Sequence, residues 1–219
     1  MTKLDAKRQF KALYGPSAKE PALVHVPPFD FLMIDGTGAP ADAEFPAALG
    51  ALYSAAYTLK FMLKKRSGGE APDYTVMPLE ALWWVEGLED PEVWVADDAV
   101  FADHADAIRW RAMIMQPGHL PAETVAEAVE EAHRKRALAA LDRLRFERWE
   151  EGLSAQIMHV GPYAAEAPTI QRLHAFAREQ GHELRGRHHE IYLGDPRRTS
   201  PERLRTVLRH PVEPRRSDR

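Results

Sequence analysis

The sequence predicts an α+β protein of two tandem, pseudo-symmetric β-α-β-β modules with antiparallel sheets and a central ligand groove. Three observations lead to this fold class. The order strand, helix, strand, strand is predicted in both halves of the chain. The halves also echo each other in sequence, since residues 111–117 resemble residues 205–211. Finally, 17 prolines among 219 residues argue against an all-helical bundle. Clefts between such modules are common ligand sites, so the groove is where function is expected.

The first module is predicted to span about residues 21–118. It opens with strands at 22–26 and 29–34, which are rich in apolar, β-branched and aromatic residues. The clearest helix follows at 45–65. Its apolar residues recur at spacings of three and four, and basic residues gather near its end, where they suit the helix dipole.

Two further strands complete this module, at 74–85 and 108–115. The acidic stretch 96–107 between them has no regular pattern and is interpreted as an insertion or loop. A helix at about 121–140 then joins the modules, with glutamates near its start and basic residues in its second half. It is more polar than the first helix, so it is expected to pack through one narrow face.

The second module is predicted to span about residues 152–212. Its elements are a strand at 153–160, a helix at 168–180, a strand around Glu190 and a short strand at 205–209. The whole chain of 219 residues is therefore expected to form a single domain made of two repeats.

An alignment of the two modules makes Glu80 the repeat partner of Glu190 and Leu82 the partner of Tyr192. Both glutamates then lie on equivalent central strands. If the modules stand side by side, we expect the two carboxylates to face one cleft from two sides.

Composition narrows the classes of function. A formal net charge of −4 gives no global basic field for binding nucleic acid. No apolar run approaches the roughly 18 residues that span a bilayer, and the charged start of the chain lacks a signal-peptide pattern. We therefore expect a cytoplasmic protein without nucleic-acid or membrane partners. Residues 1–20 are expected to form a polar surface arm, and the tail 213–219 to be disordered.

The strand around Glu190 draws attention because alternation divides its side chains between two faces. Glu190 and Tyr192 share one face with His188, whereas Ile191 and Leu193 point to the natural core side. A carboxylate beside a phenol suits the floor of a groove. A solvent-exposed sheet face explains the same pattern equally simply.

Glu80 and Glu190 are the leading catalytic candidates, because burial among aromatic residues makes a carboxylate a possible general acid or base. An ionised carboxylate there would instead attract a cationic ligand. Strict alternation places Trp84 on the face of Glu80, where it would wall the groove. Trp83 is interpreted as a core residue, and core packing remains open for Trp84.

Further ligand-binding candidates are Tyr53 and Tyr57, which share one helical face, and Trp110 at the start of a strand. Met113 and Met158 have adaptable side chains that suit varied ligands. Core packing is the alternative for all five residues.

No metal site or cofactor is expected. There is no cysteine, the ten histidines lack a recognised ligand spacing, and the adjacent His188 and His189 point to opposite faces of a strand. Nucleotide-binding glycine motifs and the serine-hydrolase G-x-S-x-G motif are also missing.

Two motifs together resemble a known family. They are QIMHVGPY at residues 156–163 and HHEIYLGDPRR at 188–198. With PLEALWW at 78–84 and the arm at 10–14, they look like the GyrI-like small-molecule-binding domain, specifically its stand-alone members. The resemblance covers nearly the whole chain except the 87–107 stretch and the tail.

The resemblance implies a function. Relatives bind cationic drugs through a buried glutamate, which corresponds to Glu190, and some stand-alone members hydrolyse strained cyclopropane rings in DNA-alkylating compounds. Transferred to this chain, Glu190 and Tyr192 would position or activate water with help from Glu80. Trp84 and Trp110 would stack on the drug.

Three functions remain open at this point. The first is cofactor-independent hydrolysis of an electrophilic xenobiotic, and the second is binding of hydrophobic or cationic small molecules without turnover. The third is interaction with gyrase, as in shorter relatives. In the first two the partner is a small molecule, and the oligomeric state, monomer or dimer, stays open.

Overall fold

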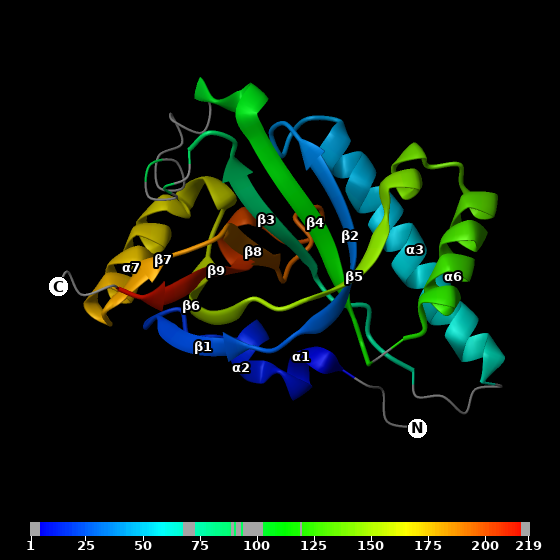
Figure 1. Ribbon diagram of the computed structural model, residues 1–219, viewed down its shortest axis with the longest axis horizontal. Coiled ribbons are helices and arrows are strands. Elements are labelled where there is room, and N and C mark those ends of the chain that lie inside the picture. Colours follow the sequence, from blue (N-terminus) through cyan, green and yellow to red (C-terminus); the bar gives the residue numbers. More distant parts are fainter. Residues whose placement is uncertain are drawn as a thin grey trace.

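The computed structural model of the chain describes residues 5–67, 73–88, 90, 93, 103–118 and 120–215. Figure 1 shows its helices and strands along the sequence. The helices are α1 (Ala6–Gln9), α2 (Lys11–Tyr14), α3 (Glu44–Arg66), α6 (Ala122–Lys135) and α7 (Ala167–Glu179). The strands are β1 (Ala22–Val26), β2 (Phe29–Thr37), β3 (Leu79–Val85), β4 (Ile108–Gln116), β5 (Arg145–Trp149), β6 (Gly152–Val160), β7 (His182–Leu184), β8 (His188–Tyr192) and β9 (Arg205–Pro214).

The strands form one antiparallel sheet in the order β1-β6-β9-β8-β3-β4-β2-β5, and β7 pairs with β9. The predicted α+β class with antiparallel pairing is confirmed. Strands β2, β3 and β4 of the first half meet β6, β8 and β9 of the second half where β3 pairs with β8, with Ala81 opposite Glu190. The two halves therefore share a continuous sheet.

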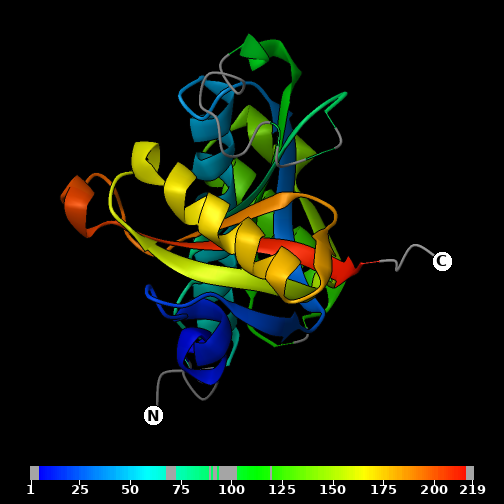
Figure 2. The ribbon, with the colours of Figure 1, turned by 90° about the vertical axis from the view of Figure 1, so that its left-hand side faces the viewer.

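Helices α3 and α7 cover the same face of this sheet, one over each half (Figures 1 and 2). Phe45 of α3 packs with its ring centroid 5.0 Å from those of Trp83 and Trp110. Residues Ile170, Leu173 and Ala177 of α7 form an apolar cluster with Ile157 and Leu208 of the sheet. Helix α6 packs on the outside of α3. A space between α3 and α7 is thus left above β3 and β8.

Local periodicity explains why the long helices form. Helix α3 buries a stripe of mostly small and aliphatic residues and ends in three basic residues, which stabilise the negative end of its dipole. The predicted joining helix is shorter than expected. It ends at Lys135 because Arg136 adopts an extended conformation, with φ −148° and ψ 118°.

The interpretation of the amino-terminal segment as a surface arm is wrong for its last turn. Helix α2 lies on the sheet face opposite α3 and α7, with Leu13 and Tyr14 buried. The hydroxyl of Tyr14 donates to Oε1 of Glu80 over 2.8 Å. The carbonyl oxygens of Ala12 and Leu13 accept hydrogen bonds from Gln156 and Arg209. The segment is therefore part of the folded core.

Three more predictions concern the ends and connections of elements. Strand β9 reaches Pro214, so the start of the expected disordered tail is ordered, and residues 216–219 lie outside the described part. Of the predicted insertion 96–107, the structure describes residues 103–107, which include a short 3-10 turn. Among the helices described, none is both long enough and apolar enough to cross a lipid bilayer.

Gly36→Ala is expected to lower the free energy of unfolding by about 2 kcal/mol, because forcing an extra methyl group into a tightly packed position costs roughly 1–3 kcal/mol. Gly36 lies opposite Trp110 in the sheet, and a Cβ atom there would overlap the indole ring. Chemical denaturation would measure the loss. Gly50→Ala is the matched control, since no atom other than those of its chain neighbours and its own helix backbone lies within 4 Å of its added methyl group. An unchanged stability of Gly36→Ala would contradict the tight fit around Trp110.

Candidate functional site

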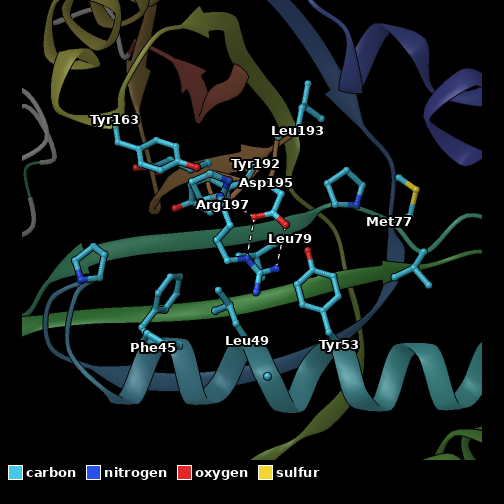
Figure 3. Close-up of a pocket in the computed structure, with 18 of the residues that line it drawn as sticks. Phe45, Leu49, Tyr53, Met77, Leu79, Tyr163, Tyr192, Leu193, Asp195 and Arg197 are labelled. Atoms are coloured by element: carbon cyan, nitrogen blue, oxygen red, sulfur yellow. Dashed lines mark hydrogen bonds and ion pairs between the residues drawn. The ribbon is translucent and has the colours of Figure 1, made fainter. Parts of the chain in front are cut away.

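A large cavity occupies the space between α3 and α7, above β3 and β8. Its volume is about 1970 Å³, larger than the roughly 300–1,000 Å³ of common small-molecule sites. Figure 3 shows α3 along one side and Tyr163 and Tyr192 on the other. This is the central groove that the predicted fold implied.

One wall of the cavity is an aromatic face of α3. Tyr53, Tyr57 and Phe61 follow one another at a spacing of four residues, and neighbouring ring centroids are 6.3 Å apart. Tyr57 and Phe61 are 47% and 59% exposed. Nearer the floor, Phe45 and Leu49 also line the cavity. A flat apolar molecule would find stacking surface along this wall.

The floor is the sheet where β3 meets β8. His188, Glu190 and Tyr192 all point to this side because they alternate along β8, and all three line the cavity. From β3, Leu79 is paired with Tyr192 and Trp83 with His188, so Leu79 and Trp83 share this face. The floor therefore combines one carboxylate with two aromatic residues and an imidazole.

Hydrogen bonds connect these floor residues in a chain. The indole Nε1 of Trp83 donates to the hydroxyl of Tyr192 over 3.1 Å. Burial, and then the charge of Glu190 and a hydrogen bond with it, raises the pKa of Tyr192 well above its usual value. Tyr192 thus stays protonated and can donate to the carboxylate, while Trp83 fixes its orientation.

Glu190 is the carboxylate of this hydrogen-bonded set of floor residues. Its side chain is 17% exposed, and its Oε1 lies 3.5 Å from Nε2 of His188. By contrast, Asp195 of the same cavity is neutralised by two hydrogen bonds of 3.0 Å from the guanidinium of Arg197 (Figure 3). A carboxylate that is held by a phenol and open to the cavity can accept a proton or attract a cation.

Tyr163 borders this part of the floor. Its ring packs edge-on against that of Tyr192, with centroids 5.6 Å apart, and it is 38% exposed. Burial, followed by the charges of Glu166 and Glu190, raises the pKa of Tyr163 to about 12. Its hydroxyl is therefore also protonated at neutral pH.

The expectation that Glu80 faces the same cleft as Glu190 is wrong. Glu80 is 1% exposed and lies on the other face of the sheet, where it accepts from Tyr14 and contacts Nε2 of His189 at 3.1 Å. Because Ala81 is the residue paired with Glu190, Glu80 shares its face with Ile191 and His189. An offset of one residue in the repeat alignment sends a side chain to the opposite face.

Glu80 belongs to a buried polar network behind the floor. Nδ1 of His189 lies 2.9 Å from Glu151, and Nη1 of Arg209 donates to the same carboxylate over 3.1 Å. Nε of Arg209 also donates to Gln156 over 3.1 Å. Burial favours a raised pKa for Glu151, but His189 and Arg209 outweigh it and lower that pKa to about 2. Burial opposes a charge on His189, and Glu151 overcomes this and raises its pKa.

The two tryptophans of β3 also exchange their expected places. Trp83 lines the cavity, whereas Trp84 points to the opposite face, where the guanidinium carbon of Arg187 lies 3.4 Å from its ring centroid. Trp110 is fully buried, packs behind Phe45 and donates to the carbonyl of Thr37 over 3.1 Å. Neither Trp84 nor Trp110 reaches the cavity, so the proposed stacking roles are wrong.

Met113 and Met158 are buried at 0% and 2% exposure and do not line the cavity. Met113 is paired with Glu80 and so shares its face of the sheet. Met77 is the methionine that does line the cavity.

Four of the candidate residues meet at the cavity, namely Glu190, Tyr192, Tyr53 and Tyr57. Their roles toward a ligand stay predictions. Sequence reasoning did not name Trp83 or Tyr163 as site residues, and it placed His188 on the face of Glu190 without giving it a role. The signal for His188 was present, since it alternates with Glu190, but that for Trp83 was hidden by the repeat alignment.

The profile of the GyrI-like small molecule binding domain matches residues 19–213. No curated protein sequence matches the chain. Solved structures do: an uncharacterized conserved protein from Listeria innocua is 37% identical, with a TM-score of 0.84, and the match covers 96% of this chain and 100% of that chain.

Two further crystal structures from Listeria innocua are each described as a hydrolase. One is 34% identical, with a TM-score of 0.80, over 97% of this chain and 100% of that chain. The other is 33% identical, with a TM-score of 0.79, over 96% of this chain and 100% of that chain. The profile match and these similarities extend across both halves of the sheet and the cavity between them. The chain belongs to the family of GyrI-like small-molecule-binding domains.

Proposed function

We propose that this protein binds hydrophobic or cationic small molecules in the cavity and hydrolyses a strained, cyclopropane-type electrophile by water attack assisted by Glu190. The observation that carries the proposal is the carboxylate of Glu190, 17% exposed on the floor of an aromatic cavity and hydrogen-bonded with Tyr192. The similarity to two proteins described as hydrolases supports turnover as well as binding.

The chemistry requires no group beyond water and the side chains of the floor. Glu190 removes a proton from a water molecule while the water oxygen forms a bond to one carbon of the ring. The strained carbon–carbon bond breaks, and its electron pair takes up one proton from solvent. Glu190 then releases the proton that it took, so one proton returns to solvent. The product is the substrate plus one water. The aromatic wall of α3 would hold the substrate over Glu190, so that attack occurs within one bound complex.

Tyr192 and Trp83 would orient the base. The phenol donates to Glu190 and cannot rotate freely, because its oxygen also accepts from the indole of Trp83. Glu80, which was expected to assist, has no part in the proposed step because it lies on the other face of the sheet. Its role is in the buried network.

Binding without turnover is the second candidate. The exposed rings of Tyr57 and Phe61 and the carboxylate of Glu190 suit a planar cation, which needs stacking and charge but no chemistry. The same residues would then form a site that sequesters the ligand.

One experiment separates the two candidates. The protein is incubated with a cyclopropane-bearing DNA alkylator, and ring opening is followed by mass spectrometry. A gain of one water at a rate above background is expected. Unchanged compound together with a saturable change in tryptophan fluorescence would replace the hydrolase with a binding module. Neither signal would contradict both functions for this class of compound.

A further inference from the structure

Three histidines lie together behind Glu190, between α7 and the sheet. They are His174 of α7, His188 of β8 and His210 of β9, with exposed fractions of 2%, 2% and 0%. The ring centroids of His188 and His210 are 6.0 Å apart, and those of His210 and His174 are 5.2 Å apart. Since His188 is also 3.5 Å from Glu190, the four side chains form a row that starts at the cavity floor.

The ring nitrogens of this row are short of partners. Among the described residues, Nε2 of His174, Nδ1 of His188 and both nitrogens of His210 have no hydrogen-bond partner, and Nε2 of His188 has only the 3.5 Å contact with Glu190. An unsatisfied buried polar atom costs about 1–3 kcal/mol. An aliphatic residue would avoid this cost, as Leu173, Ile157 and Leu208 do in the neighbouring apolar cluster. Four such atoms in one row therefore point to a function, with ordered water as the natural link between rings.

The row is chemically suited to carry protons. Burial, and then the neighbouring His188, lowers the pKa of His174 to about 3. Burial, with His174 and His188, lowers the pKa of His210 well below its usual value. The rings of His174 and His210 are then neutral near pH 7. A neutral imidazole has one N–H donor and one acceptor, so it can receive a proton on one side and release one on the other.

Metal binding is the competing explanation for clustered histidines. Within the described ranges, no group of three or more histidine, aspartate or glutamate side chains is arranged to hold a metal ion. The rings of His174 and His210 instead meet edge-on, at an interplanar angle of 89°.

We propose that His188, His210 and His174 form a proton relay for Glu190. The inference rests on the proposed function. When Glu190 has taken a proton from the attacking water, the proton passes to His188, whose opposite ring nitrogen releases one toward His210. His210 in turn releases one proton to His174, and His174 releases one to solvent, which replaces the proton that the broken bond took from solvent. Glu190 thereby returns to the carboxylate form, and no proton is gained or lost overall. His188 is thus a positioning and relay residue that acts through Glu190.

The first test measures the single-turnover rate of ring opening with the same cyclopropane-bearing compound. His188→Gly is expected to slow this rate about 100-fold, the lower range for proton transfer by a side chain. The fluorescence saturation midpoint should stay within about threefold, and added imidazole should restore at least about tenfold of the rate. His25→Gly, at an exposed residue of β1, is the matched control and should show neither effect. A full rate, or a slow rate that imidazole leaves unchanged in a folded variant, would overturn the relay.

The second test does not depend on turnover. Nitrogen-15 NMR of the imidazole rings reports which ring nitrogen carries the proton. Glu190→Gln is expected to change the proportion of the two tautomers at His210, which a relay couples to Glu190. Asp195→Asn, a carboxylate change in the same cavity, should leave it unchanged. If the wild type opens no ring, the hydrolase proposal fails while this result still decides the relay. An unchanged His210 signal in Glu190→Gln, or one bound zinc ion per purified chain, would overturn it.

Discussion

Glu190→Gln is expected to reduce the rate of ring opening by at least about 100-fold, because the amide cannot accept the proton of the attacking water. The substitution keeps the size of the side chain and its place opposite Ala81. Single-turnover mass spectrometry measures the rate, and tryptophan fluorescence measures binding of the same compound. For an uncharged compound, the dissociation constant should change by less than about threefold, since the aromatic walls are intact.

A comparison of a charged ligand with an uncharged one isolates the contribution of the Glu190 charge to binding. Benzyltrimethylammonium and its neutral isostere neopentylbenzene have the same shape and differ by one positive charge. Glu190→Gln should weaken binding of the cation about tenfold, or about 1.4 kcal/mol, and leave the neutral compound unaffected. Glu147→Gln, in the edge strand β5 and half-exposed, is the control carboxylate and should change neither rate nor affinity. Retention of ring opening by Glu190→Gln would assign the base to another group.

Much of the fold followed from local sequence patterns. The first helix was predicted at 45–65 and forms from Glu44 to Arg66, and the strand predicted at 22–26 has those bounds. Apolar spacing and β-branched runs determine such elements without reference to the rest of the chain. The predicted end of helix α6 was too late, because residues 136–140 are compatible with a helix. In the structure the chain leaves the helix after Lys135 and forms the 3-10 segment Ala139–Arg143.

The missed features all depend on contacts that are distant in sequence. Strand β5 has three charged residues among five and forms because it pairs with β2 at the edge of the sheet. Tyr14 is held in the core by contacts of its hydroxyl group, which donates to Glu80 and lies 3.4 Å from the sulfur of Met115. Neither interaction has a local signature, so the segment was interpreted as a surface arm.

The candidate site was likewise predictable within a strand but not between strands. Alternation within β8 correctly put Glu190 and Tyr192 on one face, because that relation is internal to a strand. Which face of β3 meets them depends on register, and one residue of offset exchanges Trp83 with Trp84 and removes Glu80. Pairing between strands fixes that register, and the register cannot be derived from a single sequence.

Adjacent residues of β8 consequently serve different ends. Glu190 faces the cavity, and His189 faces the buried network of Glu80, Glu151 and Arg209. Substitutions on one face should therefore affect chemistry with little change in stability, and those on the other face should do the reverse. The role of the cavity face in chemistry and the role of the opposite face in stability can therefore be tested separately.

Arg209→Met is expected to lower the free energy of unfolding by about 3–5 kcal/mol, the usual cost of removing one partner from a buried ion pair. Arg209 is 2% exposed and donates to Glu151, to Gln156 and to the carbonyl of Leu13. Methionine preserves much of its volume, so the loss reports charge and hydrogen bonding. Chemical denaturation at neutral pH measures it, and Arg134→Ala, at an exposed ion pair with Glu131, should cost less than about 0.5 kcal/mol.

The pH dependence of the free energy of unfolding tests whether the buried network causes this loss of stability. The pKa of Glu151 is lowered in the folded protein to about 2, from 4.5. Its contribution is therefore complete above pH 4.5 and is lost as the pH falls toward 2. Because Arg209 is one source of this lowered pKa, Arg209→Met should show a weaker loss of stability with acid than the wild type. A variant that keeps the stability and acid dependence of the wild type would mean that Glu151 is stabilised by His189 alone, and that Arg209 does not anchor the amino-terminal segment to the sheet.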